Sequence, residues 1–414
     1  MPFIYGDMKN TTITSLVRKG VNFPDPESVY VSDDVDPERI SGENVTIFPG
    51  ARIMGRRTLI MAGTTIGYEG PVTLDNTIVG TDCRVSGGFF CQAVLAGSNH
   101  FGSGAHVREG TILEEQACAA HTVGLKQTIL FPFVTLGSLI NFCDCFMAGG
   151  TSRKDHSEIG SSFIHFNYTP NQDKATASMM GDVHRGVMLE SRPIFLGGQG
   201  GIAGPVRIAY GCITAAGSII RKDELRENRL IFGSGSSKEI SLARQPHVYR
   251  NIGHIFNNNI HYIAGLISLK FWYRHIRPLF ACDYFSTELV KGMQKNLDSC
   301  IKERIKRFKI FCEKLEVSRK ILLSGAKDKN SALILLHDRA IEKSKSALDV
   351  FARESENKNP DKNEEIFIRI IEKKLNLNRK EYIAFIQGLE KKDKEKGSLC
   401  LYEIEKNISE KLLI

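Results

Sequence analysis

The sequence lacks the segments that direct a protein into a membrane or out of the cell. Its most apolar stretch, residues 262–269, is far too short to span a bilayer and ends at Lys270. The first residues contain no basic start followed by an apolar segment, so we expect no secretory signal. The ten cysteines include no CxxC pair of the kind that binds zinc, and we expect no metal site. These absences predict a reduced, cytoplasmic protein with no membrane span.

Positive charge is only slightly in excess, and the excess is unevenly distributed along the chain. The net charge is +8, and residues 301–414 supply +7 of it, from 27 Lys and Arg against 20 Asp and Glu. The two signs are interspersed along this region, and basic residues do not alternate with aromatic ones. Such a pattern is typical of a solvated helical surface, so we expect no nucleic-acid partner.

Glycine, by contrast, is abundant between residues 42 and 217, where apolar residues recur at every sixth position. The clearest runs are Leu95, Phe101, Val107, Leu113 and Ala119, and then Leu196, Ile202, Ile208, Thr214 and Ile220. A period of six fits neither an α-helix nor a simple strand. It predicts a β-solenoid of hexapeptide repeats, in which faces are short strands with inward apolar residues and corners are turns of small residues. At about 18 residues per coil, residues 41–223 would form roughly nine or ten coils.

Outside the repeat, the chain divides into further regions. Residues 1–40 are rich in turn-forming residues and are expected to be a lead-in. Helical periodicity after residue 223 predicts a mostly α-helical, separable C-terminal domain over 224–353, a polar linker over 354–363 and a helical tail over 364–414. Within the repeat, the apolar period is lost at residues 147–157 and 169–179. Such polar insertions often emerge on the binding side of a solenoid, so we expect both to line one cleft.

Two stretches of the repeat region resemble a known enzyme family. Residues 157–168 (SEIGSSFIHFNY) and 195–223, together with Asn141-Phe142, are similar to the acetyltransferase domain of bifunctional N-acetylglucosamine-1-phosphate uridyltransferase/glucosamine-1-phosphate acetyltransferases. The resemblance implies a left-handed parallel β-helix, a homotrimer, acetyl-CoA or another acyl-CoA as donor, and an amino sugar or sugar nucleotide as substrate. It also implies that Asn167 and Tyr168 contact the acetyl-CoA and the sugar, and that Ala215 and Ala216 belong to the last coils of the site.

The whole chain also resembles bacterial proteins described as UDP-N-acetylglucosamine pyrophosphorylase-related, through residues 141–145, 149–156, 165–170 and 269–274. The Gly-x-Gly-Thr-Arg-Met signature of the uridyltransferase domain is absent. The family's catalytic histidine falls at Asp144 or Gly150 here, and its phosphate-binding lysine at Phe146. Three functions therefore stay open: an acyltransferase acting on an amino sugar or sugar nucleotide, a nucleotidyltransferase related to the pyrophosphorylase, and a non-catalytic trimeric scaffold that recruits a partner through its helices.

Acyl transfer needs a base for the acceptor's proton and donors that hold the developing oxyanion. His165 and Asn167 would share one face of a strand, with His165 as the base and Asn167 holding the acceptor or the oxyanion. His156 is the alternative base, oriented by Asp155. Each of these polar residues has an alternative role in a solvated loop or outer face. The residues expected to bind substrate or cofactor are Asn141, Asp144, Arg153, Lys154, Asp155, Tyr168, Lys174, Ala215 and Ala216, of which Arg153, Lys154 and Lys174 suit phosphate.

Overall fold

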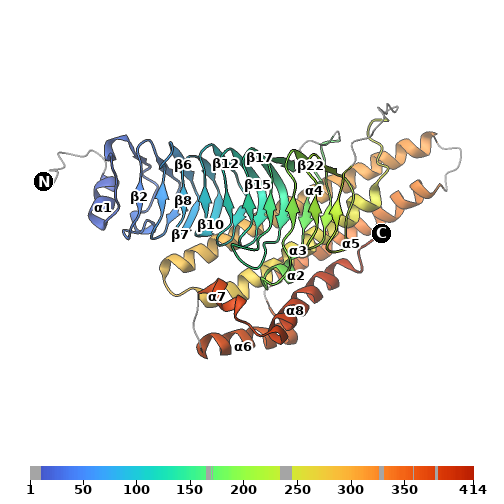
Figure 1. Cartoon of the computed structure of the whole chain (residues 1–414). Helices are drawn as coiled ribbons and strands as arrows, with labels where there is room; N and C mark the ends of the chain where they lie inside the picture. The colour runs from blue at the N-terminus through green and yellow to red at the C-terminus, as the bar shows by residue number, and fades with distance from the viewer. Residues whose placement is uncertain are drawn as a thin grey trace.

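The chain folds into a parallel β-solenoid of about 11 turns followed by a region of helices (Figure 1). The structure is a computed structural model that describes residues 11–164, 169, 171–233, 245–325, 331–357, 359–377 and 381–414. The fold class expected from the six-residue period, a left-handed parallel β-helix followed by helices, is confirmed.

The solenoid has three faces, which we number in the order in which the chain visits them. Face 1 is a ten-stranded parallel sheet. Its strands are β2 (Thr46–Ile47), β5 (Thr65–Ile66), β8 (Arg84–Val85), β11 (His100–Phe101), β14 (Cys118–Ala119), β16 (Thr135–Leu136), β18 (Glu158–Ile159), β21 (Phe195–Leu196), β24 (Ile213–Thr214) and β26 (Leu230–Ile231).

Faces 2 and 3 are joined into one 16-stranded sheet, because β15 (Val123–Leu130) and β17 (Ile140–Met147) run round the corner between them. Face 2 also contains β1 (Tyr30–Val31), β3 (Arg52–Met54), β6 (Val72–Asp75), β9 (Gly88–Cys91), β12 (Ala105–Val107), β19 (Ser162–Ile164), β22 (Gly200–Ile202) and β25 (Ile219–Ile220). Face 3 also contains β4 (Leu59–Ile60), β7 (Ile78–Thr81), β10 (Ala93–Gly97), β13 (Thr111–Leu113), β20 (Ser178–Met180) and β23 (Arg207–Ile208).

The repeat positions point inward, as the sequence predicts. Ile47, Ile66, Val85, Phe101 and Ala119 stack in register up face 1 and are buried. The corners need small residues where successive coils come close. At the corner between faces 1 and 2, a Cβ on Gly160 would lie 2.6 Å from the backbone nitrogen of Gly198, so only glycine fits there.

The solenoid extends further at both ends than the sequence predicts. Asn22 forms a β-bridge to Thr46 and β1 pairs with β3, so residues 22–40 form a first coil, and the expected lead-in over 1–40 is corrected accordingly. This coil contains the 3-10 turns η1 (Pro26–Ser28) and η2 (Pro37–Arg39), and α1 (Thr11–Lys19) precedes it. At the other end β26 pairs with β24, well beyond residue 223. Proline and aspartate in residues 24–37 serve the corners of this coil.

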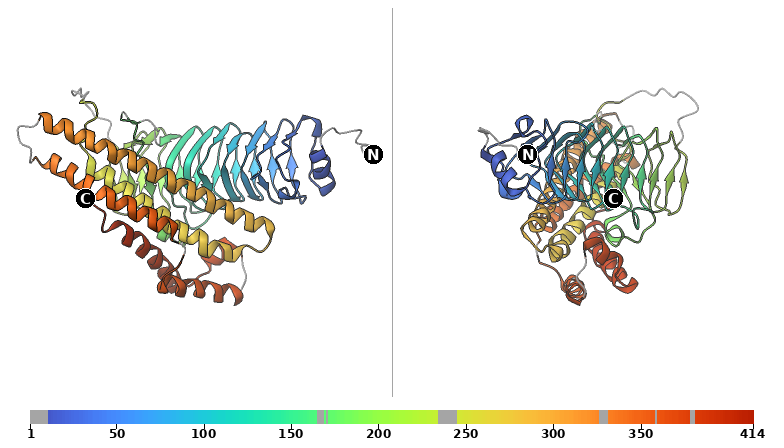
Figure 2. Two further views of the ribbon diagram at one scale, coloured as in Figure 1. Left: turned by 180° about the vertical axis from the view of Figure 1, so that it is seen from behind. Right: turned by 60° about the vertical axis from the view of Figure 1, so that its left-hand side comes forward.

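Helices cover face 3 (Figures 1 and 2). The long helix α4 (Tyr284–Gly325) contacts β4, β7, β10 and β13, and α3 (Ile252–Phe271) contacts β20. Between them lie a π-helical turn, η3 (Trp272–Ile276), and a 3-10 turn, η4 (Arg277–Phe280). The remaining helices are α5 (Ala332–Glu356), α6 (Lys362–Leu377), α7 (Tyr382–Gln387) and α8 (Lys391–Ser409).

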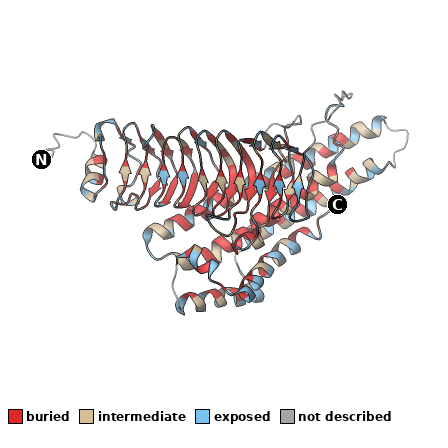
Figure 3. Cartoon of the chain, viewed as in Figure 1, coloured by how far each residue is buried: buried red, intermediate tan, exposed pale blue. Residues whose placement is uncertain are grey.

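The helical region shares one apolar core with the solenoid, whereas the sequence predicts a separable domain. Buried residues of α3, α4, α5, α6 and α8 belong to one apolar core with the solenoid (Figure 3). A glycine allows α4 to pack closely against face 3, since a Cβ on Gly292 would clash with the side chain of Ile78. The expected linker over 354–363 is also shorter, because α5 ends at Glu356 and α6 begins at Lys362.

A buried polar cluster joins the solenoid to the helices. The Tyr273 hydroxyl donates a hydrogen bond to Glu114 Oε1 at 2.6 Å, and Arg277 forms an ion pair with Glu115. Burial raises the pKa of Glu114 to about 7, although Arg277 acts in the opposite direction. The folded protein therefore holds a proton on Glu114 that the unfolded chain has lost.

We expect Glu114→Gln to stabilise the protein at high pH. Because the folded-state pKa of Glu114 lies above its ordinary value of 4.5, stability is fully present below that value and is lost as the pH rises through about 7. The difference corresponds to roughly 3 kcal/mol at pH 8 to 9. Melting temperatures of the two proteins should agree at pH 4 and diverge at pH 8, with the variant higher. Glu356→Gln, at an exposed position, is the control, and parallel pH profiles for all three proteins would contradict the prediction.

Candidate functional site

The two polar insertions emerge at different corners of the solenoid. The first, residues 148–157, leaves face 3 after β17 and returns on face 1 at β18. The second leaves face 2 after β19 and returns on face 3 at β20. In the described part of the chain, the two insertions therefore stand at different corners, whereas the sequence predicts that both line one cleft. The first insertion interrupts the corner between faces 3 and 1, and the second interrupts the corner between faces 2 and 3.

The first insertion is folded against the solenoid as a compact turn. Arg153 Nη1 donates hydrogen bonds to the carbonyl oxygens of Phe133 at 2.7 Å and Gln116 at 3.1 Å, and to Thr135 Oγ1 at 3.0 Å. Arg153, expected to bind phosphate, thus anchors the insertion to the corner between faces 3 and 1. The Gln387 side chain of α7 donates to the Thr151 carbonyl at 2.7 Å and ties the helical region to the same turn.

The sequence suggests that Asp155 orients His156, but in the structure Asp155 contacts a different residue. Asp155 Oδ2 accepts a hydrogen bond of 2.7 Å from the Thr151 hydroxyl. His156 instead places Nδ1 2.9 Å from the Arg153 carbonyl and Nε2 3.8 Å from Glu158 Oε2. Lys154 is exposed. The insertion therefore presents Lys154 at its surface and leaves His156 partly exposed, while Arg153 and Asp155 hold the turn together.

Asp144 is part of the junction between the solenoid and α4. Its carboxylate pairs with Arg304 at 2.8 Å, and both side chains are almost completely buried. Burial raises the pKa of Asp144, and Arg304 acts in the opposite direction. Asp144, expected to bind substrate, is thus held beneath a helix. Asn141, in the same strand, is half-buried on face 2 and accepts a hydrogen bond of 3.1 Å from the Cys143 thiol.

The second insertion is clamped by the helical region. The Tyr249 hydroxyl donates to Asp173 Oδ2 at 2.6 Å, and the other carboxylate oxygen accepts from the Ala175 amide at 2.9 Å. Lys314 of α4 donates to the Asn171 carbonyl. Lys174, expected to bind phosphate, lies half-buried in this insertion next to Asp173. The insertion is therefore fixed in place by residues that come much later in the chain.

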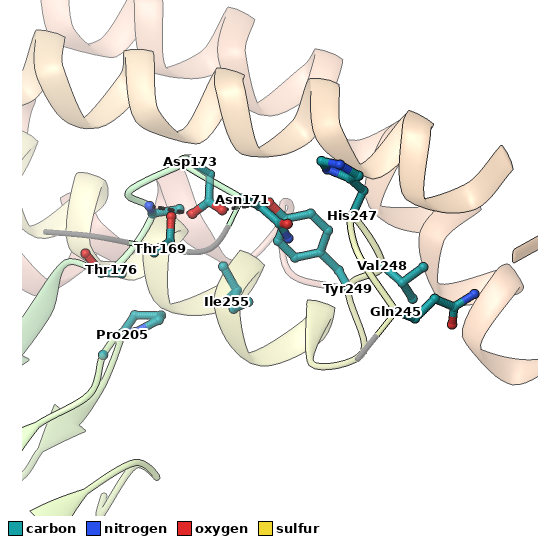
Figure 4. A pocket seen from close by; sticks show the side chains of 12 residues that line it. Thr169, Asn171, Asp173, Thr176, Pro205, Gln245, His247, Val248, Tyr249 and Ile255 are labelled. Atoms are coloured by element: carbon teal, nitrogen blue, oxygen red, sulfur yellow. Dashed lines mark hydrogen bonds between the residues drawn. The ribbon is translucent and has the colours of Figure 1, made fainter. Parts of the chain in front are cut away.

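A pocket of about 310 Å³ lies between the second insertion, the corner at Gly204-Pro205 and the segment that leads into α3 (Figure 4). It is lined by Thr169, Asn171, Asp173, Ala175, Thr176, Gly204, Pro205, Gln245, His247, Val248, Tyr249 and Ile255. Three candidate residues, His165, Asn167 and Tyr168, lie outside the described residues, between β19 and Thr169. The pocket is thus bounded by the insertion that follows Asn167 and Tyr168 directly in the sequence.

The corner between faces 1 and 2 carries small residues flanked by exposed apolar ones. Ala215 and Ala216 lie in this corner of the last coils, after Gly197 and Gly198 of the preceding coil. On face 1, Phe195, Ile213 and Leu230 form a ladder in register and are 40%, 46% and 60% exposed. Phe163 and Ile219 are exposed on face 2 of the same coils, on either side of Gly201. This edge is therefore smooth and apolar.

Comparison with curated proteins finds relatives that match about half of the chain. Bifunctional protein GlmU of Clavibacter sepedonicus is 28% identical over 204 residues, which are 49% of this chain and 36% of that protein. Bifunctional protein GlmU of an Exiguobacterium strain is 26% identical over 220 residues, 52% of this chain and 42% of that protein. Bifunctional protein GlmU of Thermotoga petrophila is 26% identical over 215 residues, 51% and 42% respectively.

The chain resembles bifunctional GlmU. The resemblance expected from the sequence is thus confirmed, and the solenoid fits a left-handed β-helix acetyltransferase domain. The chain spans well under two thirds of the length of these relatives. No protein-family model matches it. Within the described ranges, no helix is long and apolar enough to cross a membrane, and no cluster of three or more His, Cys, Asp or Glu residues is arranged to hold a metal ion.

Sequence reasoning missed the residues that the helical region adds to the GlmU-like solenoid. Tyr249 and Arg304 reach the second insertion and Asp144, and neither lies in a motif. A third insertion, residues 181–194 with the short helix α2 (Val183–Gly186), was also missed. The sequence does contain a signal for this insertion, because the six-residue period restarts only at Leu196.

Proposed function

We propose that the protein is a hexapeptide-repeat acyltransferase that transfers an acyl group from acetyl-CoA or another acyl-CoA to an amino sugar or sugar nucleotide. The observation that supports this most strongly is the GlmU-like solenoid, which carries an Asn-Tyr coil directly before an insertion that bounds a pocket. The ten cysteines are all free, which fits the cytoplasm, where acyl-CoA is available.

In the proposed reaction, the acceptor's amine or hydroxyl attacks the thioester carbonyl. A base takes the acceptor's proton, the bond between carbonyl carbon and sulfur breaks, and the proton leaves with the coenzyme A thiol. Asn167 holds the acceptor or the oxyanion. We favour His165 over His156 as the base, because His156 belongs to an insertion at a different corner from the pocket. Ala215 and Ala216 lie at a third corner, between faces 1 and 2, so they would contact the acyl-CoA only where a neighbouring chain brings its own pocket to this smooth edge.

Ligand binding tests this proposal against its two rivals. A ligand that binds only the folded state, at about a hundred times its dissociation constant, adds about 2.7 kcal/mol to stability. We expect acetyl-CoA to raise the melting temperature of the full chain. A response to nucleoside triphosphate and sugar phosphate, without a response to acetyl-CoA, would favour the nucleotidyltransferase. No response to either class would favour the scaffold.

We also propose a homotrimer assembled through faces 1 and 2. Face 3 is covered by α3 and α4, and the apolar ladder on face 1 and the exposed residues on face 2 have no covering element among the described residues. Exposed apolar patches of this kind mark protein interfaces.

Ile213→Glu should therefore convert the trimer into a monomer, because it buries a charge in the centre of the face 1 ladder. Light scattering should report three chains for the wild type and one for the variant. Leu335→Glu, at an equally exposed apolar position on α5, should stay trimeric. A wild type that is monomeric at micromolar concentration would contradict the proposed assembly.

A further inference from the structure

The pocket between the second insertion and the helical region has walls of two kinds (Figure 4). Pro205, Val248 and Ile255 provide apolar surface, and the Tyr249 ring adds to it. Thr169, Asn171, Asp173 and Thr176 provide polar groups from the insertion. At about 310 Å³, the volume stands at the lower end of the range for small-molecule sites. The pocket is therefore the size of one ring and too small for a whole coenzyme A or nucleotide.

The described lining of the pocket offers no Lys or Arg side chain to a phosphate group. Both oxygens of its one carboxylate, Asp173, are engaged, by the Tyr249 hydroxyl at 2.6 Å and the Ala175 amide at 2.9 Å. What remains is the His247 imidazole and a set of neutral hydroxyl and amide groups opposite an apolar wall. A sugar ring matches this pattern, because its hydroxyls bond to polar groups while its C–H faces pack on apolar and aromatic side chains.

One buried group in the pocket wall has no partner. Thr176 is only 7% exposed, and its hydroxyl makes no hydrogen bond with any described residue. A buried hydroxyl left unpaired costs about 1–3 kcal/mol. A ligand hydroxyl that reaches it would remove this cost, so the unpaired group favours a ligand rich in hydroxyls.

We infer that this pocket binds a single unphosphorylated hexose ring, free or as the sugar end of a larger acceptor. The inference rests on the proposed function, because it places the sugar of the acyl acceptor at this position. It goes beyond the GlmU-like solenoid, since the wall from Gln245 to Ile255 comes after the last solenoid strand and leads into α3. Any phosphate or nucleotide attached to the sugar lies outside the pocket.

Calorimetric titration of the full chain with N-acetylglucosamine and glucosamine tests the inference. We expect the wild type to bind at least one of them saturably. Thr176→Val should weaken binding at least tenfold, and Ile255→Trp, which fills the pocket from α3, should abolish it. Thr111→Val is the matched control, because the Thr111 hydroxyl is also buried and unpaired but lies outside the pocket, and this variant should bind like the wild type.

Titration of the same proteins with acetyl-CoA separates this inference from the proposed function. Acetyl-CoA should bind all four proteins equally, which also shows that the variants are folded. Acetyl-CoA binding without sugar binding, or sugar binding that is the same in Ile255→Trp and Thr176→Val as in the wild type, would overturn the assignment of the pocket and leave the acyltransferase standing. Sugar binding that responds to the variants without any acetyl-CoA binding would support the pocket and overturn the acyltransferase.

Discussion

Arg304→Met is expected to lower the free energy of unfolding by about 3–5 kcal/mol, because it leaves the Asp144 carboxylate buried without its partner. Chemical denaturation at pH 8 measures the loss. The raised pKa of Asp144 would rise further in the variant, so the carboxyl would keep its proton up to a higher pH. The folded variant then binds more protons than the unfolded chain, and its stability should fall as the pH rises from 5 to 8.

Two variants control for this effect. The double variant Asp144→Asn/Arg304→Met has no buried charge to leave unpaired and should recover most of the loss. Arg369→Met breaks an exposed pair with Glu365 and should cost at most about 1 kcal/mol. A loss of less than 1 kcal/mol in Arg304→Met would show that this ion pair does not hold α4 to the solenoid.

Asn167→Ala is expected to reduce acyl transfer by roughly 10² to 10³, the cost of losing one group that holds the oxyanion. The proposed trimer and the melting temperature should barely change, because the role proposed for Asn167 is to hold the oxyanion and not to pack the solenoid. Gln172→Ala, at an exposed position of the second insertion, is the control and should keep full activity. Less than a tenfold reduction in the Asn167 variant would place the oxyanion site elsewhere.

The solenoid could be predicted from sequence because its pattern is local. Inward residues recur about every six positions, and those one coil apart, such as Ile66 and Val85, pair in register. The first coil was missed because residues 24–37 have loop composition, which also serves the corners of a solenoid. The corners from which the insertions emerge were not predicted for a related reason. An insertion interrupts the six-residue period, so the sequence no longer indicates which face the chain has reached.

The candidate site could be predicted only where its residues belong to a recognisable coil. Asp144 was interpreted as a ligand because polar residues are rare inside a solenoid, and its buried partner Arg304 lies in a helix far along the sequence. The role of Tyr249 could not be predicted either, because nothing near it in the sequence indicates a contact with Asp173. Such pairs depend on how the helices lie across face 3, and hydrophobic periodicity specifies which side of a helix is buried without specifying its partner.

Acyl transfer measured directly tests the central claim. The full chain is incubated with acetyl-CoA and a panel of amino sugars and sugar nucleotides, and coenzyme A thiol and acetylated product are quantified together by mass spectrometry. We expect thiol and product in equal amounts with at least one acceptor, saturable in both substrates, and reduced by the Asn167→Ala substitution. Hydrolysis or absence of turnover with every acceptor, or release of pyrophosphate from a nucleoside triphosphate and a sugar phosphate instead, would contradict it.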